Sequence, residues 1–223
     1  FTQSLLVPLR PELSIEEGAS VSSASSGSAA SLASSESAFS SSSRPLTSVW
    51  RAICSAVQSS WGALDPSTTL GPLSSKSALQ NLVKQVDKAV KNGAKATLGG
   101  KTVDKQGYFY PPTILTDIKR DNPAYFEEFF GPVAMVFVVK SDDEAISLAN
   151  DSHYGLGGAI FTGNIERGKK MASRIETGMV FINTLSGTAP ELPFGGVKRS
   201  VYGHELADLG IKEFTNQKLV VVA

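Results

Sequence analysis

Apolar residues recur at helical spacing after Pro72. They fall three or four residues apart, as expected for one buried face of a helix, at Leu79, Leu82, Val83, Val86, Ala89 and Val90. Ser74 or Ser75 can cap the start of this helix, and Gly93 can end it. The pattern therefore predicts one amphipathic helix between these caps.

Later segments alternate between strand and helix patterns. Val133–Val139 is an unbroken apolar run, which is typical of a strand buried on both faces of a parallel sheet. Tyr108–Leu115 favours β-structure, but Pro111 and Pro112 suit an edge strand or an irregular connection. Further strands are expected at Leu156–Thr162, Met179–Ile182 and Leu219–Val222, and further helices at Asp142–Asn150 and Ile165–Ile175. This alternation predicts an α/β fold with a parallel sheet, whose last strand can pair outside its own domain.

Residues 1–63 differ in composition from the rest of the chain. Gly18–Ser43 is almost entirely Ser and Ala, and no Lys, Asp, Asn or Tyr occurs before Asp65. Such a segment cannot bury enough apolar surface to offset the entropy of ordering it. Two interpretations stay open: a disordered linker, or sequence translated out of frame. A glycosylated stalk is disfavoured because Thr and Pro are sparse.

Composition and charge narrow the classes of partner. The 223 residues include 21 basic and 21 acidic side chains, and this balance argues against nucleic acid or an anionic membrane as partner. The longest apolar run, Val133–Val139, is far shorter than the ~20 residues that span a bilayer. A single cysteine, Cys54, excludes an internal disulfide framework and a multi-cysteine zinc site. No segment has the order of a secretion signal, so we expect a cytoplasmic location.

Three loops carry the candidate chemistry, because open α/β sheets bind ligands beyond the C-terminal ends of their strands. They are Glu127–Val133, Asn183–Pro193 and Pro193–Ser200. Each has a plain structural interpretation as well: a solvated helix end for Glu127 and Glu128, a core anchor for Phe130, and a packed aromatic beside a tight turn for Phe194.

Glycine, histidine and cysteine residues outside these loops could also bind ligands or react, but their sequence context favours structural roles. Gly155–Gly158 lacks the spacing and helix context of a dinucleotide-binding fingerprint, which favours close packing. His153 and His204 have no second ligand at metal-binding spacing, so surface or packing roles are favoured for both. Cys54 has no basic neighbour that would lower its pKa, and nothing in the spacing marks it as reactive.

Four segments stand in a fixed order: Asp65–Pro72 (DPSTTLGP), Glu127–Val133 (EEFFGPV), Gly178–Asn183 (GMVFIN) and Pro193–Ser200 (PFGGVKRS). Together they resemble the C-terminal half of an aldehyde dehydrogenase, and the resemblance covers residues 64–223. Asp65–Pro72 and Asn183–Phe194 are most similar to the succinate-semialdehyde dehydrogenase-like branch. The resemblance implies a portion of the catalytic domain over residues 64–213 and an oligomerisation strand over residues 214–223.

The resemblance also implies an activity: NAD- or NADP-dependent oxidation of succinate semialdehyde, or a related short semialdehyde, to the carboxylic acid, in a homo-oligomer. Glu128 matches the carboxylate that holds the nicotinamide ribose, a role that suits a group able to accept two hydroxyl hydrogen bonds. Phe130 matches the aromatic residue beside that ribose and the nicotinamide.

The aldehyde side of the site is implied in the same way. Asn183 to Phe194 matches the loop at the mouth of the aldehyde tunnel, with Phe194 lining it. Ser186 and Thr188 stand where a hydroxyl can hydrogen-bond the distal carboxylate of a substrate.

The resemblance also requires groups that the sequence does not supply. The chemistry of the family needs a cysteine thiolate that attacks the aldehyde. Cys54 stands too close to Asp65 to leave room for the strand and helix expected between them. We therefore assign no catalytic residue and expect this chain to be inactive alone. The alternative is a non-enzymatic association module that pairs with full-length subunits.

Overall fold

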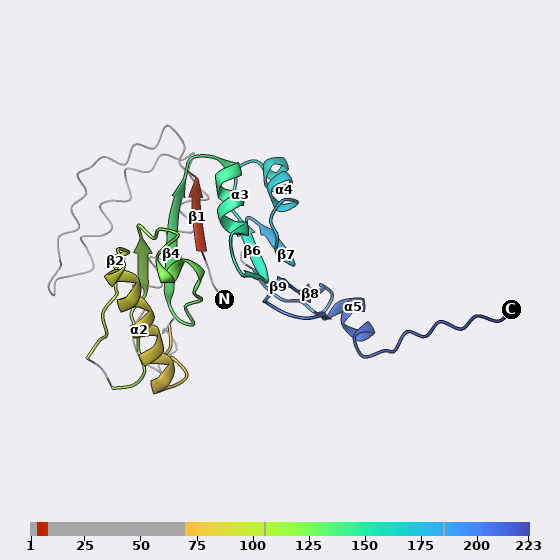
Figure 1. The fold of residues 1–223 in the computed structure, drawn as a ribbon, viewed down its shortest axis with the longest axis horizontal. Helices are drawn as coiled ribbons and strands as arrows, with labels where there is room; N and C mark the ends of the chain where they lie inside the picture. Colours follow the sequence, from red (N-terminus) through yellow and green to blue (C-terminus); the bar gives the residue numbers. More distant parts are fainter. Residues whose placement is uncertain (1–3, 9–69, 105, 185) are drawn as a thin grey trace.

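The computed structural model describes residues 4–8, 70–104, 106–184 and 186–223 (Figure 1). A four-stranded sheet forms the first part, in the order β1-β4-β3-β2. Its strands are β1 (Ser4–Pro8), β2 (Lys95–Leu98), β3 (Thr113–Thr116) and β4 (Val133–Val139). β1 and β3 both run parallel to β4, whereas β2 pairs antiparallel with β3 at the edge. The α/β class is confirmed, and the sheet is mixed because of this edge strand.

The helix predicted after Pro72 is α2 (Lys76–Lys91), which lies beside the sheet in Figure 1. Ser75 is its N-cap, and its hydroxyl accepts a hydrogen bond from the amide of Ala78 at 3.1 Å. Gly93 follows the last turn with a φ of +101°, a left-handed conformation that suits glycine. The helix buries Leu82, Val86 and Ala89, as its apolar spacing predicts.

The main core lies between α2 and the sheet. It includes Leu82, Val86, Tyr110, Leu115, Ala124, Phe129, Val133 and Met135. β4 has the predicted bounds, but the prediction that both its faces are buried is wrong. Val133, Met135 and Val139 are buried, whereas Val138 is 54% exposed. Alternate residues of a strand point to opposite faces, and α2 packs on only one of them.

A second group of elements follows β4. It comprises α3 (Asp142–Asn150), β5 (Tyr154–Gly155), β6 (Gly157–Ile160), α4 (Ile165–Ala172) and β7 (Met179–Ile182). β6 and β7 pair in parallel, and α3 and β7 have the predicted bounds. β6 and α4 are shorter than predicted, and α4 ends at its C-cap, Ser173.

Short elements complete the described chain. They are η2 (Pro123–Phe126), β8 (Phe194–Gly195), β9 (Val197–Lys198), β10 (His204–Glu205) and α5 (Ala207–Lys212). β8 pairs with β10 and β5 pairs with β9, both antiparallel. Gly155 lies against the carbonyl of Glu176 and the side chain of Val197, in keeping with the close packing expected at Gly155–Gly158.

The strand predicted at Leu219–Val222 is not formed. In the described part of the chain, no strand follows β10, and the last residues run away from the body as an exposed tail (Figure 1). A strand needs a hydrogen-bonded neighbour, and none of the described segments pairs with the tail. Within the described residues, no helix is long and apolar enough to cross a membrane.

Most of the Ser-rich segment lies outside the described residues. Only Ser4–Pro8 of residues 1–63 is described, as β1. Cys54, Asp65 and the expected boundary at residue 64 fall outside, so the interpretations of that segment remain predictions.

Candidate functional site

Glu128 and Phe130 lie in the loop between η2 and β4. This loop comes directly before β4, and β3 and β4 run parallel from Thr113 and Val133, which are paired. The loop therefore lies at the N-terminal edge of these strands. Our expectation that all three loops follow the C-terminal ends of strands is wrong here, because the β3–β4 connection returns to the start of the sheet before it enters β4.

The two phenylalanines of this loop have opposite environments. Phe129 is 3% exposed and packs in the main core, whereas Phe130 is 73% exposed. The interpretation of Phe130 as a core anchor is therefore wrong, since Phe129 has that role. An aromatic side chain this exposed offers a face to a ligand or a partner.

The two adjacent carboxylates also differ. The Lys88 ammonium donates to the Glu127 carboxylate at 2.8 Å. Gln85, one turn earlier on α2, donates its side-chain amide to the main-chain carbonyl of Glu128 at 3.0 Å. Both contacts come from one face of α2, so this helix fixes the backbone of the loop and engages the carboxylate of Glu127.

Asn183 begins the second loop, directly after β7. Its φ is +58°, a left-handed conformation that asparagine tolerates. Its side-chain oxygen accepts from the amide of Thr162 at 2.7 Å, and its side-chain nitrogen donates to the carbonyl of Thr162 at 2.9 Å. Because its side chain makes two hydrogen bonds to the backbone of Thr162, just after β6, Asn183 holds the start of the loop after β7 in place.

A cavity of about 200 Å³ lies beside β7 and the end of this loop. It is lined by Met179, Val180, Phe181, Gly187, Thr188, Leu192, Pro193 and Phe194. Thr188 and Phe194, two of the predicted substrate-binding residues, thus meet at one cavity. Ser186 is exposed, and neither it nor Asn183 is among the lining residues. The lining is mainly apolar with one hydroxyl, which suits a small organic molecule with a polar group.

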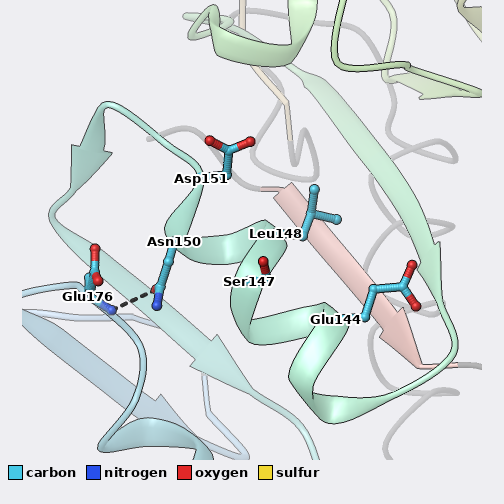
Figure 2. A pocket seen from close by; sticks show the side chains of 6 residues that line it. All are labelled: Glu144, Ser147, Leu148, Asn150, Asp151 and Glu176. Atoms are coloured by element: carbon cyan, nitrogen blue, oxygen red, sulfur yellow. Dashed lines mark hydrogen bonds between the residues drawn. The ribbon is translucent and has the colours of Figure 1, made fainter.

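A larger, open hollow of about 630 Å³ runs along α3 (Figure 2). It is lined by Glu144, Ser147, Leu148, Asn150, Asp151 and Glu176. The Asn150 side chain accepts from the amide of Glu176 at 2.8 Å and donates to the carbonyl of Arg174 at 2.9 Å. This asparagine therefore ties α3 to the segment before β7, a structural role.

Asp151, directly after α3, has a carboxylate with a strongly lowered pKa. The Arg120 guanidinium donates to both of its oxygens, at 2.8 and 3.1 Å, and the Tyr125 hydroxyl donates at 3.0 Å. These hydrogen bonds lower the pKa of Asp151 to about 2. Burial, and then the hydrogen bond to Asp151, raise the pKa of Tyr125.

The same cluster explains His153. Its ring stacks on Phe126, with ring centroids 5.0 Å apart, and the Arg120 guanidinium lies over the Phe126 ring, 5.4 Å from its centroid. His153 is exposed and packs on an aromatic ring, in keeping with the surface or packing role expected from the sequence. In the described ranges, no group of three His, Cys, Asp or Glu side chains could hold a metal ion.

The comparison with known sequences decides the family. The sequence model of the Aldehyde dehydrogenase family matches residues 49–220. This chain belongs to the aldehyde dehydrogenase family.

Several relatives within the family carry more specific names. Over 156 residues, the chain is 53% identical to succinate-semialdehyde dehydrogenase [NADP(+)] of Deinococcus radiodurans, a match that covers 70% of this chain and 33% of the relative. The probable succinate-semialdehyde dehydrogenase [NADP(+)] of Synechocystis is 46% identical over 162 residues, covering 71% of this chain and 36% of the relative. The chain thus spans about a third of the length of these curated relatives.

Solved structures agree with the fold. Succinic semialdehyde dehydrogenase from Streptococcus pyogenes, in complex with NADP+, aligns with a TM-score of 0.71 and 48% identity, covering 74% of this chain and 36% of that chain. The NAD+ complex of an aldehyde dehydrogenase from Bacillus cereus aligns with a TM-score of 0.72 and 34% identity, covering 78% of this chain and 36% of that chain.

This member of the aldehyde dehydrogenase family contains contacts that sequence reasoning missed. Gln85 and Lys88 lie on the polar side of an amphipathic helix, where a solvated face is the ordinary expectation. Their partners are about 40 residues away in the chain. The sequence predicts the helix but not these two contacts, because they depend on the loop before β4 folding back onto α2.

Proposed function

We propose that this chain forms part of an NAD- or NADP-dependent dehydrogenase that oxidises succinate semialdehyde, or a related short semialdehyde, to the carboxylic acid. The observation that carries this proposal is the cavity beside β7, where Thr188 and Phe194 meet. The names of the relatives at 46–53% identity support the substrate class. From the family resemblance and the balanced charge of the sequence, we further propose a cytoplasmic homo-oligomer that does not use nucleic acid or a membrane as partner.

Glu128 and Phe130 are the residues we assign to the cofactor. The exposed ring of Phe130 and the neighbouring carboxylate of Glu128 fit a sugar joined to a flat ring. An ionised carboxylate accepts hydrogen bonds from two vicinal hydroxyls, and an aromatic face packs against a planar heterocycle. The bound nicotinamide would supply the hydride acceptor for the oxidation.

The loop after β7 is the part we assign to the aldehyde. Phe194 and Leu192 give the cavity an apolar wall, and the Thr188 hydroxyl offers a hydrogen bond to the distal carboxylate of a semialdehyde. Asn183 supports this loop through Thr162 and does not line the cavity. Ser186, which does not line the cavity, is the weaker candidate for a substrate contact.

We expect no turnover from the isolated chain, because the thiolate that attacks the aldehyde has no counterpart at the expected position. The test is therefore a chimaera in which residues 70–223 replace the matching third of the Deinococcus radiodurans relative. The proposal expects aldehyde-dependent reduction of NADP+ or NAD+ by the chimaera, with kcat/KM for succinate semialdehyde within about tenfold of the relative, a barrier difference under about 1.4 kcal/mol. The proposal fails if the folded chimaera binds cofactor but oxidises no short semialdehyde.

A non-enzymatic association module is the second candidate. The apolar tail Leu219–Val222 supports it, since its four side chains are between 71% and 89% exposed. Such a segment can add as a strand to the sheet edge of another subunit. Co-purification of the chain with a full-length relative, abolished by Val220→Glu with Val221→Lys, would support this candidate. A monomeric chain that never associates with the relative would exclude it.

A further inference from the structure

The loop that carries Glu128 is held to α2 at three successive residues. Lys88 pairs with the Glu127 carboxylate, Gln85 bonds the carbonyl of Glu128, and Phe129 is buried in the core. Gly131 completes the attachment, because a side chain at this position would collide with Leu82. Phe130, between these anchors, is the residue left exposed.

The contact of Gln85 differs from that of Lys88 in what it fixes. The Lys88 side chain is half-exposed, and exposed ion pairs contribute little to stability. The bond from Gln85 is partly buried and reaches a main-chain atom. A main-chain bond sets the orientation of the peptide plane, which in turn sets the direction in which the Glu128 side chain leaves the backbone.

We propose that Gln85 is a positioning residue that orients Glu128 for cofactor binding, while Lys88 pairs with the neighbouring carboxylate of Glu127. This inference rests on the proposed function, in which Glu128 holds the nicotinamide ribose. It gives α2, which the sequence predicts only as a structural helix, a part in cofactor binding. It also assigns a structural role to Glu127 and a cofactor-binding role to Glu128.

The first test measures the orientation of the loop without any activity. Gln85→Leu is introduced into the full chain, and hydrogen exchange is followed by mass spectrometry over residues 127–131. Loss of one partly buried hydrogen bond should speed exchange there by about two- to tenfold. Gln80→Leu is the matched control, because Gln80 is an exposed glutamine of the same helix. Equal exchange in the Q85L and Q80L variants would overturn the inference.

The second test measures the consequence for cofactor binding in the active chimaera. Gln85→Leu should raise KM for the nicotinamide cofactor by about three- to tenfold and leave KM for the aldehyde unchanged, since a hydrogen bond that preorganises one residue acts on that ligand alone. Gln85→Glu keeps the side-chain length but replaces the donor with an acceptor, so it should not rescue the cofactor KM. An unchanged cofactor KM in Q85L, beside a raised one in Glu128→Gln, would overturn the inference.

The two tests separate this inference from the proposed function. If Glu128→Gln itself leaves the cofactor KM unchanged, the proposed role of Glu128 fails, whatever Gln85 does to hydrogen exchange. If Glu128→Gln raises the cofactor KM but Gln85→Leu changes neither exchange nor KM, the proposed role stands and the positioning role fails.

Discussion

The two loops of the proposed site are supported in different ways. The loop with Glu128 and Phe130 lies against α2 and the main core, and Phe129 anchors it. The loop from Asn183 to Phe194 follows β7, whose four residues are only partly buried. The first loop is held by two side chains of α2, whereas the second is tied to Thr162 through the side chain of Asn183. The comparison indicates a rigid cofactor side and a more open aldehyde side.

The largest expected effect tests the rigid side. Leu82→Ala removes a side chain that is 1% exposed and lies against Gly131. We expect the free energy of unfolding to fall by about 2–5 kcal/mol, as for buried leucines elsewhere. Urea unfolding followed by circular dichroism measures it. Val221→Ala in the exposed tail is the control and should change little, so equal effects of L82A and V221A would remove the distinction between the two regions.

Two asparagines sharpen the comparison. Asn122 is 2% exposed; its side-chain nitrogen donates to the carbonyls of Ala89 and Asn92, and its oxygen caps η2 at Ala124. Asn122→Ala leaves buried polar groups unpaired and should cost about 2–4 kcal/mol.

The exposed Asn183 provides the counterpart in the open region. Asn183→Gly keeps the left-handed backbone but loses two hydrogen bonds to Thr162, and should cost about 1 kcal/mol. Urea unfolding of both variants checks the order. A larger loss for N183G than for N122A would contradict the assignment of the rigid region.

The aldehyde side is tested by substrate kinetics in the chimaera. Thr188 lines the cavity and Ser186 does not. Thr188→Val should raise KM for succinate semialdehyde by about tenfold, because a lost hydrogen bond to a charged group costs about 1.5 kcal/mol. Ser186→Ala is the matched control and should leave this KM nearly unchanged. The reverse order would place the distal carboxylate at Ser186, outside the cavity.

The smallest expected effect concerns acid stability. Arg120 and Tyr125 lower the pKa of Asp151 from its usual 3.8 to about 2. A carboxyl group whose pKa is lower in the folded state stabilises the fold above its unfolded pKa, and this contribution is lost as the pH falls toward the folded pKa. The loss should therefore occur between pH about 4 and pH about 2.

Asp151→Asn checks this expectation. The urea midpoint of the variant should fall less steeply than that of the wild type over this pH range, and Arg120→Met should behave in the same way. Parallel pH profiles for wild type and D151N would contradict the assignment.

Local pattern predicted much of the fold. The bounds of Val133–Val139, Asp142–Asn150 and Met179–Ile182, and the cap at Ser75, could be predicted because they depend on nearby side chains. Burial on both faces of β4 was wrong, and the segment Leu219–Val222 forms no strand within the described chain, so its pairing with another subunit stays a prediction. Each depends on which other segments lie alongside, and a run of apolar residues does not specify that.

The candidate site shows the same limit. The family resemblance assigned Asn183, Ser186, Thr188 and Phe194 to the substrate; only Thr188 and Phe194 line the cavity, and their binding roles stay predictions. The structural interpretation took Phe130 as the core anchor, but Phe129 is the buried one, because the path of the loop past α2 decides which of the two apolar rings is buried. The roles of Gln85 and Lys88 also required the three-dimensional arrangement.

One measurement tests the central claim most directly: the cofactor KM of the chimaera with Glu128→Gln, compared with Glu127→Gln. The two side chains are adjacent and chemically identical, and in the structure the Lys88 ammonium pairs with the carboxylate of Glu127. The account predicts at least a tenfold rise in cofactor KM for E128Q, since hydrogen bonds to a charged group are worth about 1.5–3 kcal/mol, and a change below about twofold for E127Q, as for an exposed ion pair. Equal cofactor KM values for the two variants would contradict it.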